Sequence, residues 1–126
     1  MAMRALRGAT TVDKDDPAEI RVRTTDLLNK LFERNEISHD DVISIIFTTT
    51  ADVTALPPAA AARDIGLVDV ALLCAQEMET SVGPNRCIRL MLHVETDRSR
   101  QELKHVFVRG AVVLRPDLAE PGDEEM

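Results

Sequence analysis

The chain has 126 residues, of which 44% are hydrophobic, so it is long enough for one domain with a buried core. Aromatic residues make up only 2%, and the formal net charge is -7, which together argue against a nucleic-acid partner because bases need stacking surfaces and phosphates need a basic face. A small anionic ligand stays compatible with this charge, since a few arginines in a cleft dominate a distant acidic surface.

Cysteine content and hydropathy indicate the compartment. Cys74 and Cys87 are too few for a disulfide framework, which favours a reducing environment. No apolar signal-peptide segment follows Met1, and no apolar run approaches the length of a membrane span. We therefore expect a cytoplasmic protein without a membrane partner.

The first half of the chain predicts a strand, a helix, a second strand and a short helix. Residues 3–12 alternate small or apolar with polar residues and end in β-branched ones, which is typical of a strand. Asp16 suits the cap of a helix and Pro17 its first position, and this helix should end near Asn35. Residues 42–50 predict a buried strand. An alanine-rich helix over residues 58–65 follows.

The second half predicts mainly strands. We expect them over residues 68–75, 87–96, 105–108 and 111–114, with a polar helical turn between 97 and 102. Residues 120–126 are acidic and contain Pro121 and Gly122, so we expect a disordered tail after a domain spanning residues 1–119.

This order of elements predicts an α+β fold, a mixed sheet with helices on one face. The strands are largely apolar, and no further helix is available for the other face. A homo-oligomer that packs sheets around a symmetry axis would cover it.

Arg89 is the most informative candidate for a functional residue. In the strand over residues 87–96, a period of two places Ile88, Leu90, Leu92 and Val94 on one face, so Arg89 points the other way with Cys87 and Met91. An arginine among such neighbours needs an anionic partner. That partner is either a ligand or a structural carboxylate, such as Glu77 or a carboxylate of another subunit.

Arg7 and Glu77 are weaker candidates when taken alone. Arg7 aligns with the small Ala5 and Ala9, which leaves room beside its guanidinium, although many strand arginines are surface residues. Glu77 ends a predicted strand, where functional groups gather. Cys74 is more often a core residue than a nucleophile.

The sequence contains no cluster of metal-ligating residues, no nucleotide-binding loop and no histidine placed to activate a cysteine. It offers arginines and one carboxylate. This combination favours binding an anion over covalent catalysis.

Four segments appear in order along residues 3–118: a strand around Arg7, the stretch from Cys74 to Glu77, Cys87-Ile88-Arg89, and Leu114-Arg115-Pro116-Asp117. With these segments the chain resembles the monofunctional trimeric α/β chorismate mutases. The resemblance implies an isomerase that rearranges chorismate to prephenate in aromatic amino acid biosynthesis. It also implies a homotrimeric pseudo-α/β barrel with active sites between subunits, and no metal or cofactor.

The resemblance further implies roles for individual residues. Arg7 and Arg89 would bind the carboxylates and ether oxygen of the substrate, with Arg89 at the bond that breaks. Glu77 would take the ring hydroxyl. The other residues expected to line, close or flank the site are Arg63, Leu73, Cys74, Ala75, Gln76, Phe107, Leu114 and Arg115.

Three positions depart from the family pattern. Phe107 stands where a Tyr is usual, Pro57 where a Phe is usual, and Ala60 where a Lys is usual. Two other functions remain open on the sequence. Imine deaminases share this architecture and an interface arginine, and a non-catalytic sensor of an aromatic-pathway acid would need the same anion site.

Overall fold

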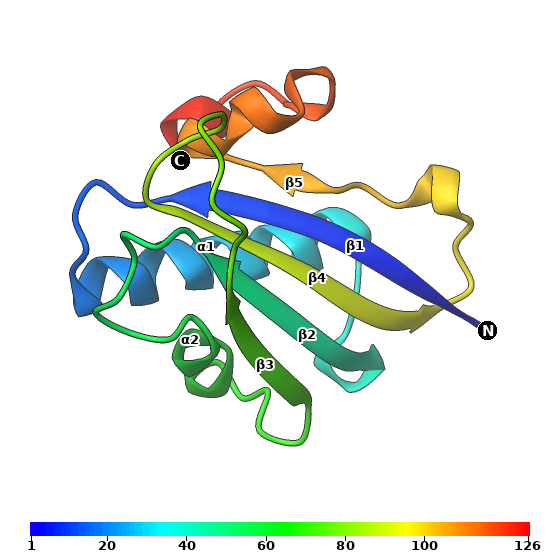
Figure 1. Ribbon diagram of the computed structural model, residues 1–126. Helices are drawn as coiled ribbons and strands as arrows, with labels where there is room; N and C mark the ends of the chain where they lie inside the picture. Colours follow the sequence, from blue (N-terminus) through cyan, green and yellow to red (C-terminus); the bar gives the residue numbers. More distant parts are fainter.

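A computed structural model describes all residues, 1–126, and its elements alternate between strands and helices in the first half of the chain (Figure 1). No helix is long and apolar enough to cross a membrane. The elements are β1 (Ala2–Thr11), α1 (Pro17–Asn35), β2 (Val42–Thr49), α2 (Ala59–Asp64), β3 (Ala71–Gln76), β4 (Cys87–Thr96) and β5 (Val106–Phe107), with short 3-10 turns between α1 and β2, between β4 and β5 and after β5.

The five strands form one mixed sheet in the order β3-β2-β4-β1-β5. β4 runs antiparallel to both β1 and β2, while β3 is parallel to β2 and β5 is parallel to β1. This confirms the α+β prediction of a mixed sheet. β3 and β5 are the two edge strands, which separates their residues by the width of the sheet.

Helix α1 begins and ends where its capping residues predict. The Asp16 side chain accepts a hydrogen bond from the Glu19 N–H, Pro17 occupies the first helical position, and Glu36 takes a left-handed conformation (φ 52°) after Asn35. The apolar side of α1 packs on the sheet. Gly8 allows this close approach, because a Cβ there would lie 3.0 Å from a methyl group of Leu31.

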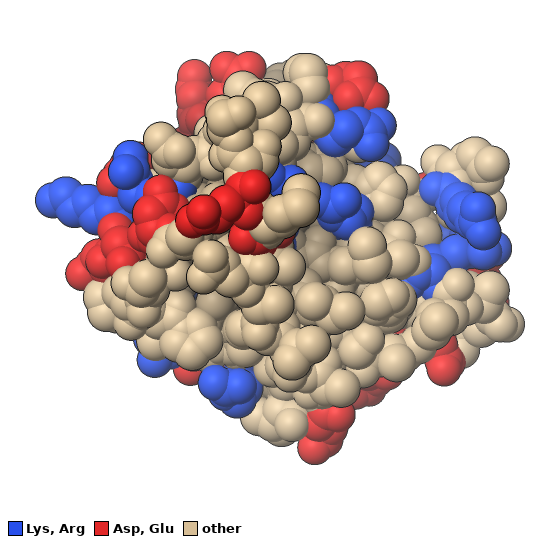
Figure 2. Space-filling view, viewed as in Figure 1, with Lys and Arg blue, Asp and Glu red and all other residues tan.

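Both helices lie on one face of the sheet, as predicted (Figure 1). Ile88, Leu90, Leu92 and Val94 of β4 are all at most 2% exposed on that side. The opposite face carries no helix. Its apolar side chains stay in contact with solvent: Met3, Ile46, Leu73 and Met91 are between 38% and 61% exposed. Figure 2 shows that uncharged side chains form most of this face, with basic atoms in its upper middle part.

The segment after β5 corrects one prediction. Residues 111–114 were expected to form a strand, but Arg109–Leu114 is a 3-10 turn. Arg109 has a positive φ of 54°, which an extended strand does not adopt, and the Gly110 N–H donates to Thr11 Oγ1. Ala111 is therefore buried against Ala9, Cys87 and Phe107 instead of pairing in the sheet.

The acidic tail also differs from the expectation of disorder. Residues 123–125 form a 3-10 turn, and the Asp123 side chain is only 1% exposed. Asp123 accepts two hydrogen bonds from the guanidinium of Arg34 on α1. Burial disfavours the charged carboxylate, but these bonds outweigh it and lower the pKa of Asp123. Arg34 also lies 3.8 Å from the Glu120 carboxylate, so two ion pairs anchor the tail on the helix.

Candidate active site

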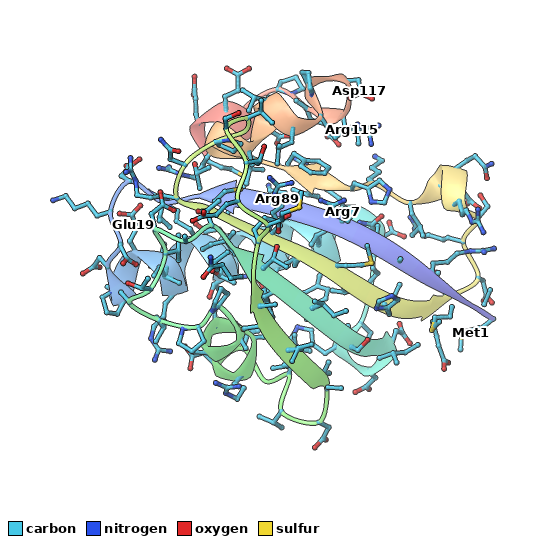
Figure 3. The ribbon with its side chains drawn as sticks, viewed as in Figure 1. Met1, Arg7, Glu19, Arg89, Arg115 and Asp117 are labelled. Carbon is cyan, nitrogen blue, oxygen red and sulfur yellow. The ribbon has the colours of Figure 1, made fainter.

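Arg7 on β1 and Arg89 on β4 project from the uncovered face of the sheet. The antiparallel register pairs Arg7 with Met91 and Arg89 with Ala9, so the two arginines are diagonal neighbours on adjacent strands. The small side chain of Ala9 leaves space beside Arg89. Figure 3 shows the two arginine side chains next to each other in front of the sheet. The strand pairing therefore gathers two guanidinium groups at one place.

Glu77 brings a carboxylate to these arginines. Its backbone N–H donates to the Thr49 carbonyl oxygen at 2.7 Å, which extends the pairing of β3 with β2 by one residue. Its Oε1 lies 4.0 Å from Arg89 Nε, an ion-pair distance that is too long for a hydrogen bond. Arg89 Nε is buried and has no hydrogen-bond partner. The guanidinium therefore keeps an unused donor beside the carboxylate.

A hollow of about 250 Å³ contains these three groups. It is lined by Arg7, Ile46, Thr48, Glu77, Arg89, Leu90 and Met91. A second hollow of about 540 Å³ shares Glu77 and Arg89 and lies under the loop from Met78 to Asn85. The site thus joins two cations, one anion and an apolar wall, which suits a small organic dianion.

Phe107 supports Arg7 from the neighbouring strand. The Cζ atom of Arg7 lies 5.9 Å from the centroid of the Phe107 ring, within the range of a cation–π contact. The Phe107 ring is 3% exposed and packs with Ala9, Cys87 and Ala111. A buried ring of this kind is a rigid support for the guanidinium. Phe107 itself lines none of the three hollows, so it meets the site only through Arg7.

Leu114 and Arg115 lie above β5, in the segment expected to close the site. Leu114 is half-buried against the cluster that contains Phe107. Arg115 is exposed, and its Nη2 lies 2.9 Å from Asp117 Oδ2 (Figure 3). This pairing raises the pKa of Arg115 and lowers the pKa of Asp117. Arg115 is thus paired within its own segment, and neither it nor Leu114 lines any of the three hollows.

The stretch from Cys74 to Gln76 does not join the hollow of Arg7 and Arg89. The β2–β3 register pairs Cys74 with Phe47, whose side chain is buried on the helix-bearing side. Cys74, Ala75 and Gln76 instead line a separate hollow of about 320 Å³ with Pro57 and Pro58. Within one chain, the expected site is therefore divided into two parts.

Four other positions from the sequence analysis also lie apart from the two arginines. Leu73 is 61% exposed and lies on β3, the edge strand farthest from β1. Arg63 is exposed in the last turn of α2 and lines none of these hollows. Ala60 is buried in α2, so its small side chain serves the packing of the helix. Pro57 is exposed beside Cys74.

The site offers no activated thiol. Burial raises the pKa of Cys87 to about 11, although the neighbouring Arg89 opposes this shift. The Cys87 thiol is therefore protonated at neutral pH and is a packing residue. No group of three or more His, Cys, Asp or Glu side chains is placed to hold a metal ion.

Sequence reasoning missed Thr48, Ile46 and His105. Thr48 pairs with Arg89 across β2 and β4 and lines the hollow, as does Ile46 two residues earlier. The period of two along β2 could have indicated both, once the register with β4 was known. His105 accepts a hydrogen bond from the backbone of Arg7. No spacing in the sequence indicates that contact, because 98 positions separate the two residues.

The chain was compared with known families and structures. The family model for chorismate mutase type I matches residues 3–118. The protein named chorismate mutase AroH from Bacillus subtilis (strain 168) is 41% identical over 120 residues, which cover 94% of each chain. The protein of the same name from Thermus thermophilus is 43% identical over 117 residues, which cover 92% of this chain and 96% of that protein.

The fold agrees with these relatives. A solved structure of a chorismate mutase from Clostridium thermocellum, Cth-682, superposes with a TM-score of 0.85 at 44% sequence identity. The match covers 87% of this chain and 98% of that chain.

Proposed function

Because the chain belongs to the chorismate mutase type I family, we propose that the hollow containing Arg7, Glu77 and Arg89 is where it converts chorismate to prephenate. The chain is a chorismate mutase, an isomerase of aromatic amino acid biosynthesis. This family membership favours the mutase over the imine deaminase and the sensor. The observation that carries the site assignment is Arg89, which lines the hollow with Arg7 and Glu77 and whose buried Nε has no protein acceptor.

The charges of the hollow match the substrate. Chorismate has two carboxylates, an ether oxygen and a ring hydroxyl, so it presents two negative charges and several acceptors. Arg7 and Arg89 supply guanidinium groups, and Glu77 supplies a carboxylate that can accept from the hydroxyl. A planar guanidinium suits a carboxylate because it donates two parallel hydrogen bonds.

The rearrangement is unimolecular, and no proton has to be transferred. The site can lower the barrier in two ways. It holds the enolpyruvyl arm over the ring, in a geometry close to that of the reaction. It also stabilises negative charge that develops on the ether oxygen as the old bond breaks ahead of the new one. A fixed donor such as Arg89 Nε is most effective there, because its orientation costs nothing during the reaction.

We further propose that a homotrimer completes each site. Support comes from the two separate hollows and from the exposed apolar side chains on the uncovered face. β3 and β5 are opposite edges of the sheet, so the Cys74 stretch of one copy can meet the Arg7 side of the next. In that arrangement Leu73, Cys74, Ala75, Gln76 and Arg63 would come from the neighbouring subunit.

The direct test is turnover of chorismate by the purified protein in the presence of a metal chelator. Loss of chorismate absorbance and appearance of prephenate, in equal amounts, are expected. Unchanged chorismate in a folded, concentrated sample would contradict the proposal. Chorismate that is consumed only after metal is added would contradict the mechanism and leave the assignment of the substrate intact.

A further inference from the structure

The hydrogen-bond ladder between β1 and β5 ends just before Arg7. The two strands pair only at Gly8 with Val106 and at Ala9 with Phe107. The Arg7 N–H has no carbonyl acceptor there and instead donates to Nδ1 of the His105 imidazole, at 2.8 Å. A side chain thus replaces the next rung of the ladder, and this bond is partly buried.

This contact fixes the protonation state of the imidazole. Nδ1 can accept a hydrogen bond only when it carries no proton, so the ring is neutral, with its proton on Nε2. Burial lowers the pKa of His105, and the charges of Arg115 and Arg7 lower it further. The acceptor form therefore dominates at neutral pH.

We propose that His105 is a positioning residue for Arg7 in the mutase reaction. The imidazole fixes the Arg7 backbone, while Phe107, two residues further on, supports the guanidinium. His105 thus holds the main chain of Arg7, and Phe107 holds its side chain. The proposal rests on the role of Arg7 in binding the substrate, which is itself proposed above.

Protonation of His105 would have two opposing effects. It would break the bond to Arg7 and release the end of the ladder. It would also place a cation near Arg7, Arg115 and the adjacent Lys104, with Asp117 already paired to Arg115, and a cation attracts a dianion. If positioning is the main role of His105, the loss of the bond outweighs this attraction, and kcat/KM falls as His105 is protonated.

The experiment compares the wild-type protein with three variants. His105→Asn keeps an acceptor, since Oδ1 of Asn occupies the place of Nδ1 of His, but it does not titrate. His105→Ala removes the acceptor. His39→Asn is the matched control, because His39 is an exposed histidine whose ring contacts Phe32 at a tilted angle. For each, kcat and KM for chorismate are measured between pH 5 and 8.

At neutral pH, His105→Ala should lower kcat/KM about tenfold, the effect expected for one lost hydrogen bond of ordinary strength. His105→Asn should retain most of the activity and lose the decline that the wild type shows below the ordinary histidine pKa of about 6.5. The control variant His39→Asn should show the same decline in kcat/KM as the wild type. Unchanged activity in His105→Ala, or a wild-type kcat/KM that rises on acidification, would overturn the proposal.

A second measurement needs no variant and no substrate. In the wild-type protein, the amide proton resonance of Arg7 should titrate together with the His105 ring resonances. If the enzyme is active but the Arg7 amide resonance does not change as His105 titrates, the inference about His105 is wrong and the proposed function stands. A protein without mutase activity whose Arg7 amide titrates would overturn the proposed function and leave the hydrogen bond established.

Discussion

Arg89 Nε lies 4.0 Å from Glu77 Oε1, and it is buried without a hydrogen-bond partner. The carboxylate is therefore close enough to orient the guanidinium but does not saturate it. An unsatisfied buried donor costs free energy, and an acceptor that reaches it recovers that energy.

Replacing Arg89 should slow the chemical step. Arg89→Gln removes the charge and should raise the activation free energy by about 3 kcal/mol, in line with the loss of one donor to a developing oxyanion. Arg89→Lys should also be impaired, because an ammonium group cannot present the planar fork of donors. Steady-state kcat with chorismate checks both. Arg100→Lys, at an exposed arginine of a 3-10 turn, is the control and should be normal.

Glu77 should tolerate an amide better than an alanine. Glu77→Gln keeps an acceptor for the substrate hydroxyl, whereas Glu77→Ala leaves that hydroxyl without one. We expect a loss of about 1 kcal/mol in binding for Gln and a further loss of similar size for Ala. Affinity for prephenate, measured by calorimetry, separates the two. Equal affinities for Gln and Ala would remove Glu77 from its assigned role.

The two cysteines should differ in reactivity. Cys74 is exposed, whereas Cys87 is buried with its pKa raised to about 11. Because the thiolate is the reactive species, iodoacetamide at pH 7.5 should modify Cys74 alone. Mass spectrometry of tryptic peptides gives the site. Prephenate should slow the modification if Cys74 lines a completed active site, and the absence of such protection would argue against that placement.

A charge on the uncovered face should disrupt the assembly. Leu73 is 61% exposed on β3, and Leu73→Lys should weaken a homotrimer while leaving the fold of each chain intact. Sedimentation equilibrium should then show monomers, with activity that rises with protein concentration. Val68→Lys is the control, since Val68 is 69% exposed outside the sheet. A wild-type protein that sediments as a monomer would contradict the trimer itself.

The Arg34–Asp123 ion pair should hold the acidic tail in place. Asp123→Ala removes the shorter of the two ion pairs between Arg34 and the tail and leaves the 3.8 Å contact with Glu120, so residues 120–126 should exchange their amide hydrogens faster, at a cost of about 1–3 kcal/mol. Glu124→Ala, at an exposed residue, should change nothing. Hydrogen exchange measured by mass spectrometry distinguishes the variants.

The same ion pair predicts a pH dependence. The pKa of Asp123 is lower in the folded chain than in the unfolded one, where it is about 3.9. The stabilisation is therefore complete above pH 3.9 and is lost as pH falls through the lower, folded value. The Gly122 amide resonance should stay constant from neutral pH down to about pH 4 and shift below it.

Local sequence patterns predicted much of the secondary structure of this protein. Asp16 and Pro17 mark the start of α1, and the period of two along β4 assigns Arg89 to the face opposite Leu90. Helix capping and strand periodicity depend on residues that are close in the sequence, so they can be predicted without knowledge of distant segments. The same patterns predicted a mixed sheet with one uncovered face.

The segment 111–114 shows where pattern reading fails. A short apolar run suits either a strand or any other buried segment, and periodicity alone does not separate them. The positive φ of Arg109 and the bond from Gly110 to Thr11 decided the outcome. Thr11 is 99 positions away from Gly110, so no local signal existed.

The sequence by itself determined the helix boundaries, the inward rows of the strands and the residue types of an anion site, because each follows from spacing within one element. Only the tertiary structure decided that Arg7 and Arg89 are diagonal neighbours and that Cys74 lies apart from them. It also decided that Asp123 is anchored on α1 and that the His105 side chain accepts the Arg7 N–H at the end of the β1–β5 ladder. Each of these depends on strand register or on contacts between remote segments. Such contacts form only when the whole core packs, so the burial that creates them is a property of the folded chain and not of any segment.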